Sequence, residues 1–194
     1  DEFLLKELRG LDRVRAEWQE IKEVSFECYK AKNIRASIVQ IACEHMDGTR
    51  KGNAYFFYNS IAGICAVVKF LNKSKIFRNK IAVIAGHSEH TKQKLAEVNL
   101  EIANPYAHEK INFVTSTAHE GVDFYDPDGV TYIVSDNNYN NSKYSLLTTI
   151  PQIVGRLRDS KYSDSATVLF NGTALVKAQT KEELEELIAY NIKQ

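Results

Sequence analysis

The sequence has few cysteines and prolines, no excess of either charge and no long apolar run. Its three cysteines are an odd number without a C-x-x-C pair, which is typical of a reduced, cytoplasmic protein rather than of a disulfide-linked secreted domain. No run of about 18 apolar residues occurs, so we expect neither a membrane span nor a membrane partner. Residues 1–6 also lack the basic start and apolar core of a signal peptide.

Two kinds of ligand motif are missing as well. No G-x-x-x-x-G-K-[ST] loop occurs, and no acidic Mg²⁺-binding motif follows a predicted strand, so the chain should be unable to hold a nucleoside triphosphate by itself. Cys43-x-His45 and His87-x-x-His90 are isolated pairs, and we therefore expect no metal site. The balance of 25 basic and 25 acidic residues argues against a free-standing nucleic-acid clamp but allows one wall of a channel.

From residue 34 onward, short apolar runs alternate with amphipathic helical stripes. Hydrophobic residues make up 44% of the chain, as in a globular domain. Because the strands are apolar on both faces and the connections are short, the sequence predicts an α/β fold, a three-layer α/β/α sandwich with a mostly parallel sheet. The predicted strands are 54–58, 81–85, 111–114, 130–134 and 166–170. A capping box at Thr180 predicts a last helix.

Two stretches depart from this alternation. Residues 1–33 predict a short helix, a hinge at 10–12 and two strands, 13–18 and 24–29, that pair with each other or extend the edge of the sheet. Residues 136–145 are rich in Asn, Tyr and Ser and predict an exposed loop. A solvated loop is favoured there over a role for Tyr139 and Tyr144 in stacking bases.

The first segment that carries chemistry follows the strand 111–114. Thr115 and Ser116 come directly after the strand, and Gly121-x-Asp123 follows a few residues later. Polar groups at the carboxyl end of a parallel strand lie where open α/β sheets bind their ligands. Helix capping is the simpler alternative for Thr115 and Ser116.

The second segment is Pro-Gln-Ile-Val-Gly-Arg-Leu-Arg at 151–158. Arginine suits charge on a transferring phosphoryl group, because its planar fork donates two hydrogen bonds and keeps its proton. Gln152 precedes Arg156 by one helical turn, so we expect the two to share a helix face. A pair of surface arginines on an ordinary helix is the alternative interpretation.

Together the two segments resemble motifs V and VI of superfamily 2 helicases, which lie in the second RecA-like domain of those enzymes. The first has the spacing T-x-x-x-x-x-G-x-D, and the second fits Q-x-x-G-R. Many members place a second arginine three residues after the first. Here Arg158 follows Arg156 after two residues, and Asp159 fills the usual position. The resemblance therefore leaves open which arginine is the arginine finger, the residue that contacts the γ-phosphate. Two other strand ends, Tyr58-Asn59-Ser60 and Gly86-His87-Ser88, resemble places where the family contacts the nucleic-acid backbone.

The resemblance, which covers about 54–172, implies a RecA-like domain at 34–194. Residues 1–33 would be a linker or edge segment following an absent first RecA-like domain of the same parent chain. That domain would bind most of the ATP and Mg²⁺, and the partner of both domains would be single-stranded or duplex nucleic acid. The catalytic residues that the resemblance implies are Arg156, Arg158 and Gln152. The cofactor-binding residues are Gly121, Asp123 and Gly155, and the nucleic-acid-binding residues are Thr115, Ser116, Asn59, Ser60 and His87.

Other interpretations stay open at this point. The chain can be a non-catalytic α/β module that binds nucleic acid or protein and only retains the scaffold. A flavodoxin-like or receiver-type signalling domain fits the alternation too, but predicts a cluster of acids at strand ends that the sequence lacks. The densest basic stretch, 69–80, is interpreted as a solvated helix end rather than as a phosphate contact.

Overall fold

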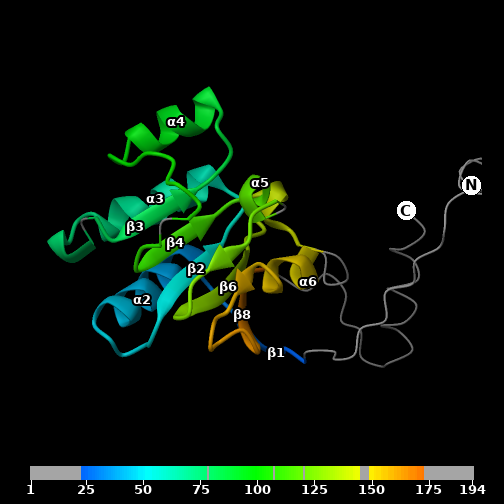
Figure 1. Ribbon diagram of the computed structural model, residues 1–194. Coiled ribbons are helices and arrows are strands. Elements are labelled where there is room, and N and C mark those ends of the chain that lie inside the picture. The colour runs from blue at the N-terminus through cyan, green and yellow to red at the C-terminus, as the bar shows by residue number, and fades with distance from the viewer. Residues whose placement is uncertain (1–22, 78, 107, 120, 145–148, 173–194) are drawn as a thin grey trace, which may run out of the picture.

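A six-stranded parallel sheet forms the centre of the computed structural model, which describes residues 23–77, 79–106, 108–119, 121–144 and 149–172 (Figure 1). The strand order is β1-β8-β6-β2-β4-β3, and every neighbouring pair is parallel. The strands are β1 (Ser25–Lys30), β2 (Asn53–Phe57), β3 (Ile81–Ile84), β4 (Ile111–Val114), β6 (Gly129–Ser135) and β8 (Ser165–Phe170).

Both faces of the sheet are covered. The helices α2 (Ile34–Met46), α3 (Ile61–Leu71) and α4 (Glu89–Ala96) lie on one face, and α6 (Thr149–Val154) lies on the other (Figure 1). Beside α6, a small parallel ribbon pairs β5 (Phe124–Tyr125) with β7 (Leu157–Arg158). Short turns of helix complete the described part: η1 (Lys75–Phe77), α5 (Ser116–His119) and η2 (Asn140–Ser142). The predicted α/β/α fold class is confirmed.

Alternation along β2 divides the core into two halves. Phe56 and Tyr58 pack beneath the three helices, whereas Tyr55 and Phe57 face α6 and the ribbon. All four side chains are fully buried. This burial on both sides explains why the strand is a continuous apolar run, as expected of a central parallel strand.

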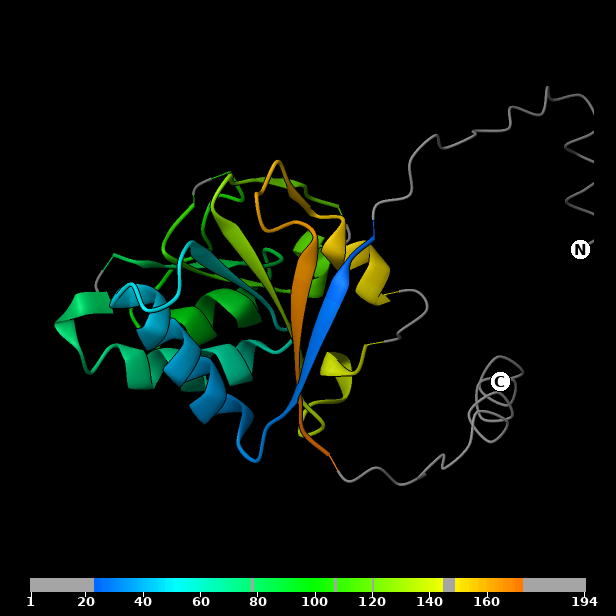
Figure 2. The same cartoon turned by 90° about the horizontal axis from the view of Figure 1, so that it is seen from below.

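The edge of the sheet includes part of the amino-terminal segment. The predicted strand 24–29 forms β1, which pairs with β8 and so extends the sheet (Figure 2). The predicted strand 13–18, the hinge at 10–12 and the helix from Thr180 lie outside the described residues. Within the described part, no helix has the length and apolar character needed to cross a membrane.

Three helices begin immediately after a turn that leaves a strand. The side-chain oxygens of Asn33, Ser60 and Ser88 accept hydrogen bonds from backbone N–H groups in the first turns of α2, α3 and α4. Such caps satisfy donors that the helix itself leaves unpaired. The caps therefore fix where the chain turns from sheet to helix, and all three turns lie at the carboxyl edge of the sheet.

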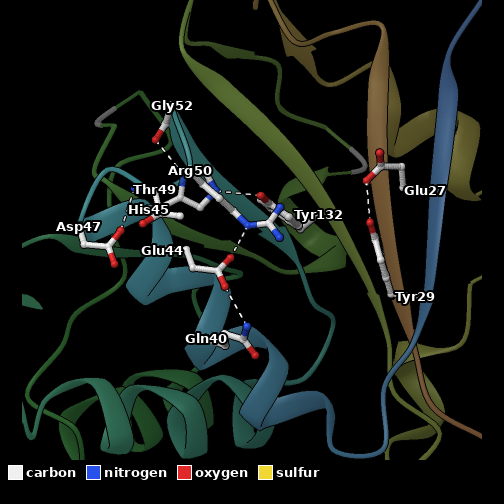
Figure 3. Close-up of polar contacts among 10 residues, drawn as sticks. All are labelled: Glu27, Tyr29, Gln40, Glu44, His45, Asp47, Thr49, Arg50, Gly52 and Tyr132. Carbon is white, nitrogen blue, oxygen red and sulfur yellow. Dashed lines mark hydrogen bonds and ion pairs between the residues drawn. The ribbon is translucent and has the colours of Figure 1, made fainter.

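A buried histidine closes the carboxyl end of α2. The Nδ1 atom of His45 lies 3.0 Å from the carbonyl oxygen of Gly52, and its Nε2 lies 2.8 Å from the hydroxyl of Tyr132 (Figure 3). Since a carbonyl only accepts, Nδ1 carries the proton and Nε2 accepts from Tyr132. Burial lowers the pKa of His45, and the bond to Gly52 only partly opposes this. The nearby charges of Lys110 and Arg50 lower it further.

We expect this histidine to make the fold sensitive to mild acid. Its pKa is lowered in the folded state, so the unfolded chain takes up a proton first and stability falls as the pH drops below about 6.5. His45→Gln keeps a donor for Gly52 and an acceptor for Tyr132 but cannot titrate. Its melting temperature should therefore fall less than that of the wild type between about pH 7 and about pH 5. Parallel pH profiles for the two proteins would contradict this assignment.

Candidate nucleic-acid groove and arginine cluster

An open groove of about 770 Å³ lies at the carboxyl edge of the sheet, beyond the ends of β2, β3, β4 and β6. Its walls are the segments 59–62, 85–88, 90–91, 115–117 and 138–141. The structure brings together here all five residues that the sequence predicts to contact nucleic acid: Asn59, Ser60, His87, Thr115 and Ser116.

Asn59 holds three walls of the groove together. Its Oδ1 accepts hydrogen bonds from the backbone N–H of Ser116, at 3.1 Å, and from the hydroxyl of the same residue, at 2.9 Å. Its Nδ2 donates to the carbonyl oxygen of Asn141, at 2.8 Å, and its backbone N–H donates to the Tyr144 hydroxyl. The side chain of Asn59 is thus engaged within the protein, and it shapes the groove by joining the ends of β2 and β4 to the loop after β6.

That loop is more buried than its composition predicts. The prediction of an exposed loop at 136–145 holds for most of the described residues but is wrong for Asp136, which is buried, and for Tyr144, which is partly buried beside β2. The carboxylate of Asp136 accepts hydrogen bonds from the Tyr58 hydroxyl, at 2.7 Å, and from Asn138. Burial by itself would raise the pKa of Asp136, but these hydrogen bonds outweigh it and lower the pKa. The loop is therefore fastened to the sheet as a fixed wall.

The groove presents an environment that suits an anion. The amino-terminal ends of α3 and α4, capped by Ser60 and Ser88, open onto it, and helix starts carry partial positive charge. His87 and His90 also line the groove, and both are exposed. Among the described residues, no acidic side chain lines it.

The predicted catalytic arginines lie elsewhere, on the face of the sheet that α6 covers. Arg156, Arg158 and Asp123 together form what we call the arginine cluster. Asp123, just before β5, pairs with both arginines across the ribbon: Arg156 Nη1 lies 3.2 Å from its Oδ1, and Arg158 Nε lies 3.3 Å from its Oδ2. The side chain of Arg158 is 52% exposed, against 23% for Arg156. Arg158 is therefore the arginine that can reach a ligand or partner with less rearrangement.

The other residues predicted for catalysis or for the nucleotide come a few positions before Asp123 and Arg156 in the chain. Gly155 occupies the turn between α6 and β7, and a Cβ at Gly121 would meet nothing within 4 Å, so backbone approach there is open. Gln152 is exposed on α6. The expectation that Gln152 and Arg156 share a helix face is wrong, because α6 ends at Val154 and Arg156 leads into β7.

Other candidate features lie apart from both sites. The basic stretch 69–80 runs from the end of α3 to the start of β3, at the amino edge of the sheet and opposite the groove. Within the described residues, no three of the His, Cys, Asp and Glu side chains are grouped closely enough to hold a metal ion.

Sequence reasoning missed several residues of the groove. The wall 138–141 belongs to the stretch interpreted as a solvated loop, and Thr117 and His90 were given no role there. Two signals were available: His90 follows His87 after only three positions, and the loop is dense in Asn and Tyr. Neither signal shows by itself which strand end the loop packs against.

Comparison with known proteins identifies no family for this chain. A scan against protein-family models gives no match, and neither does a search of curated proteins. What the chain does is therefore inferred from the geometry of the groove and of the arginine cluster.

Proposed function

We propose that this chain is the second RecA-like domain of a superfamily 2 ATP-dependent helicase or translocase. The observation that carries the proposal is the groove: five residues singled out by their resemblance to helicase motifs, and drawn from three strand ends, line one hollow at the carboxyl edge of a parallel sheet. Open α/β sheets bind their ligands at this edge. The ligand proposed for the groove is the phosphate backbone of a single-stranded or duplex nucleic acid.

Recognition in this groove would be independent of sequence. Backbone N–H groups and exposed hydroxyl side chains such as that of Thr117 suit phosphate oxygens, and such contacts position a strand without distinguishing bases. The absence of acidic side chains among the described lining residues leaves the attraction of phosphates unopposed. We therefore expect binding that weakens steadily as the salt concentration rises.

The arginine cluster supports the second half of the proposal. ATP and Mg²⁺ would be held mainly by a first RecA-like domain, and the arginine cluster would face them across the cleft between the two domains. Arg158 is the proposed finger for the γ-phosphate, because its guanidinium is the more exposed. Asp123 and Arg156 would position it through the shared ion pairs, and Gly121 leaves room for close approach of a nucleotide.

The proposed setting is the cytoplasm. All three cysteines are free, although Cys28 and Cys43 are exposed, which suits a reducing compartment.

Introducing a negative charge into the groove should abolish most of the binding. We expect the chain to bind a fluorescent oligo(dT), measured by anisotropy, and His87→Glu to weaken the affinity by about tenfold or more, since like charges facing each other cost several kcal/mol. Gln93→Glu adds the same charge to α4 at an exposed position outside the groove and should change little.

Two results would count against the proposal. Failure of the wild-type chain to bind any oligonucleotide would remove the nucleic-acid role. Equal losses in His87→Glu and Gln93→Glu would show that net charge, and not the groove, governs the binding.

A further inference from the structure

A second polar hollow, of about 380 Å³, adjoins the groove on the side of β1 and β8. It lies where β1, β6 and β8 end. Its lining residues are Lys32, Asn33, Ile34, Arg35, Asp136, Asn138 and Asn171. No residue that the resemblance to helicases singled out belongs to it, and the proposed function does not use it.

The two hollows are neighbours along the sheet edge. Asn138 lines both of them. Tyr139 lines the groove and contacts Arg35, which lines the second hollow. The Nη2 atom of Arg35 donates a hydrogen bond to the Tyr139 hydroxyl, at 2.7 Å, and its guanidinium carbon lies 6.0 Å from the centre of the ring. Arg35 therefore stands at the junction, with one edge of its guanidinium fixed by the wall of the groove.

The second hollow carries more positive than negative charge, with two cations against one carboxylate. In the described part of the chain, neither Lys32 nor Arg35 takes part in an ion pair, and Lys32 is exposed. The one acid in the hollow, Asp136, is buried, and its carboxylate already accepts hydrogen bonds from Tyr58, Asn138 and Asn171. Neutral donors thus hold this carboxylate and neither cation forms an ion pair with it, so the hollow keeps a net positive charge that can attract an external anion.

We propose that a nucleic-acid strand lying in the groove continues past Tyr139 into this second hollow, where Arg35 and Lys32 bind its next phosphates. This rests on the proposed function and extends it, because it assigns a second phosphate subsite to the domain and makes its footprint longer than the groove alone. The guanidinium would hold a phosphate through its free donors, and the ammonium of Lys32 would act as a flexible point charge beside it. Tyr139 would form the ridge between the two subsites.

The test compares a short and a long oligo(dT), of about 4 and about 12 nucleotides, in anisotropy titrations with the 194-residue chain. The Lys32→Ala/Arg35→Ala double variant should bind the long oligonucleotide about tenfold more weakly and the short one almost as well as the wild type. For the long oligonucleotide, the slope of log affinity against log salt should become shallower by about 1.4, as expected from the loss of two phosphate contacts on a single strand.

Two controls separate a local effect from general ones. Lys73→Ala/Lys75→Ala removes the same charge at the opposite edge of the sheet and should leave both affinities unchanged. Tyr139→Phe removes the hydroxyl that Arg35 contacts but keeps the ring, and it should retain most of the preference for the long oligonucleotide. A loss in Tyr139→Phe as large as in the double variant would overturn the proposal, since Arg35 would then act only by holding Tyr139.

The remaining outcomes are equally decisive. Equal losses for short and long oligonucleotides, or none for either, would overturn the second subsite while leaving the groove in place. If His87→Glu also leaves binding intact, the groove itself fails as the primary site. Absence of binding by the wild type at either length defeats the proposed function, and the subsite with it.

Discussion

Replacing Arg158 by alanine is expected to lower nucleic-acid-stimulated ATP hydrolysis by about 10³-fold or more in an enzyme that joins this domain to a phosphate-loop domain. An arginine reaching across the cleft stabilises charge that develops on the γ-phosphoryl group, and this stabilisation is absent in the ground state. ATP binding, measured with a fluorescent analogue, should therefore change far less than turnover. Arg158→Lys should recover little, because the ammonium lacks the planar fork.

Arg156→Ala serves as the matched comparison. Arg156 is more enclosed and pairs with the same carboxylate of Asp123, so its loss should act by displacing Arg158 and cost about 10²-fold. A larger loss in Arg156→Ala than in Arg158→Ala would reverse the two roles. Unchanged turnover in both variants would remove the motor function and favour a non-catalytic binding module.

The strand ends of this domain could be predicted from the sequence because each depends on a local signal. The short apolar run 54–58 is typical of a buried strand. Ser60, two positions after it, has the side-chain oxygen that caps the start of a helix. Once several strands run in parallel, their polar ends must meet at one edge. Asn59, His87 and Thr115 gather around one groove because β2, β4 and β3 are also neighbours in the sheet.

The loop after β6 and the ribbon could not be predicted in the same way. Asp136 is buried where it contacts Tyr58, which lies 78 positions earlier in the chain. No local sequence pattern shows that these two residues meet. The ribbon pairs strands of two residues each, which are too short to show a hydrophobic period in the sequence. The sequence therefore predicts a helix that includes Arg156, whereas α6 ends at Val154. Arg158 consequently lies in an extended strand beside Asp123 rather than on a helix face.

The contact between Tyr58 and α3 is the point at which fold and groove depend on each other. A Cβ placed on Gly63 would lie 2.1 Å from the Tyr58 hydroxyl oxygen and 2.4 Å from its ring carbon Cζ. The ring is fully buried beneath the helix, and its hydroxyl donates to Asp136 at 2.7 Å. Glycine at this position lets the ring pass under α3 and reach the loop that forms the far wall of the groove.

Gly63→Ala should therefore destabilise the domain, although alanine is the better helix former by about 1 kcal/mol. We expect a loss of about 3 kcal/mol from overpacking and from displacing the Tyr58–Asp136 hydrogen bond, or roughly 10 °C in melting temperature. Oligonucleotide affinity should fall with it, because the wall 138–141 loses its anchor. Gly121→Ala is the control, since open space surrounds that position.

A double-variant comparison shows whether this clash is the cause. In a Tyr58→Leu background the hydroxyl and the ring atoms nearest the added methyl are gone, so Gly63→Ala should cost almost nothing there and can stabilise α3 slightly. A penalty of the same size in both backgrounds would place the strain elsewhere in α3. A tolerated Gly63→Ala with full oligonucleotide affinity would mean that Tyr58 does not hold the wall of the groove.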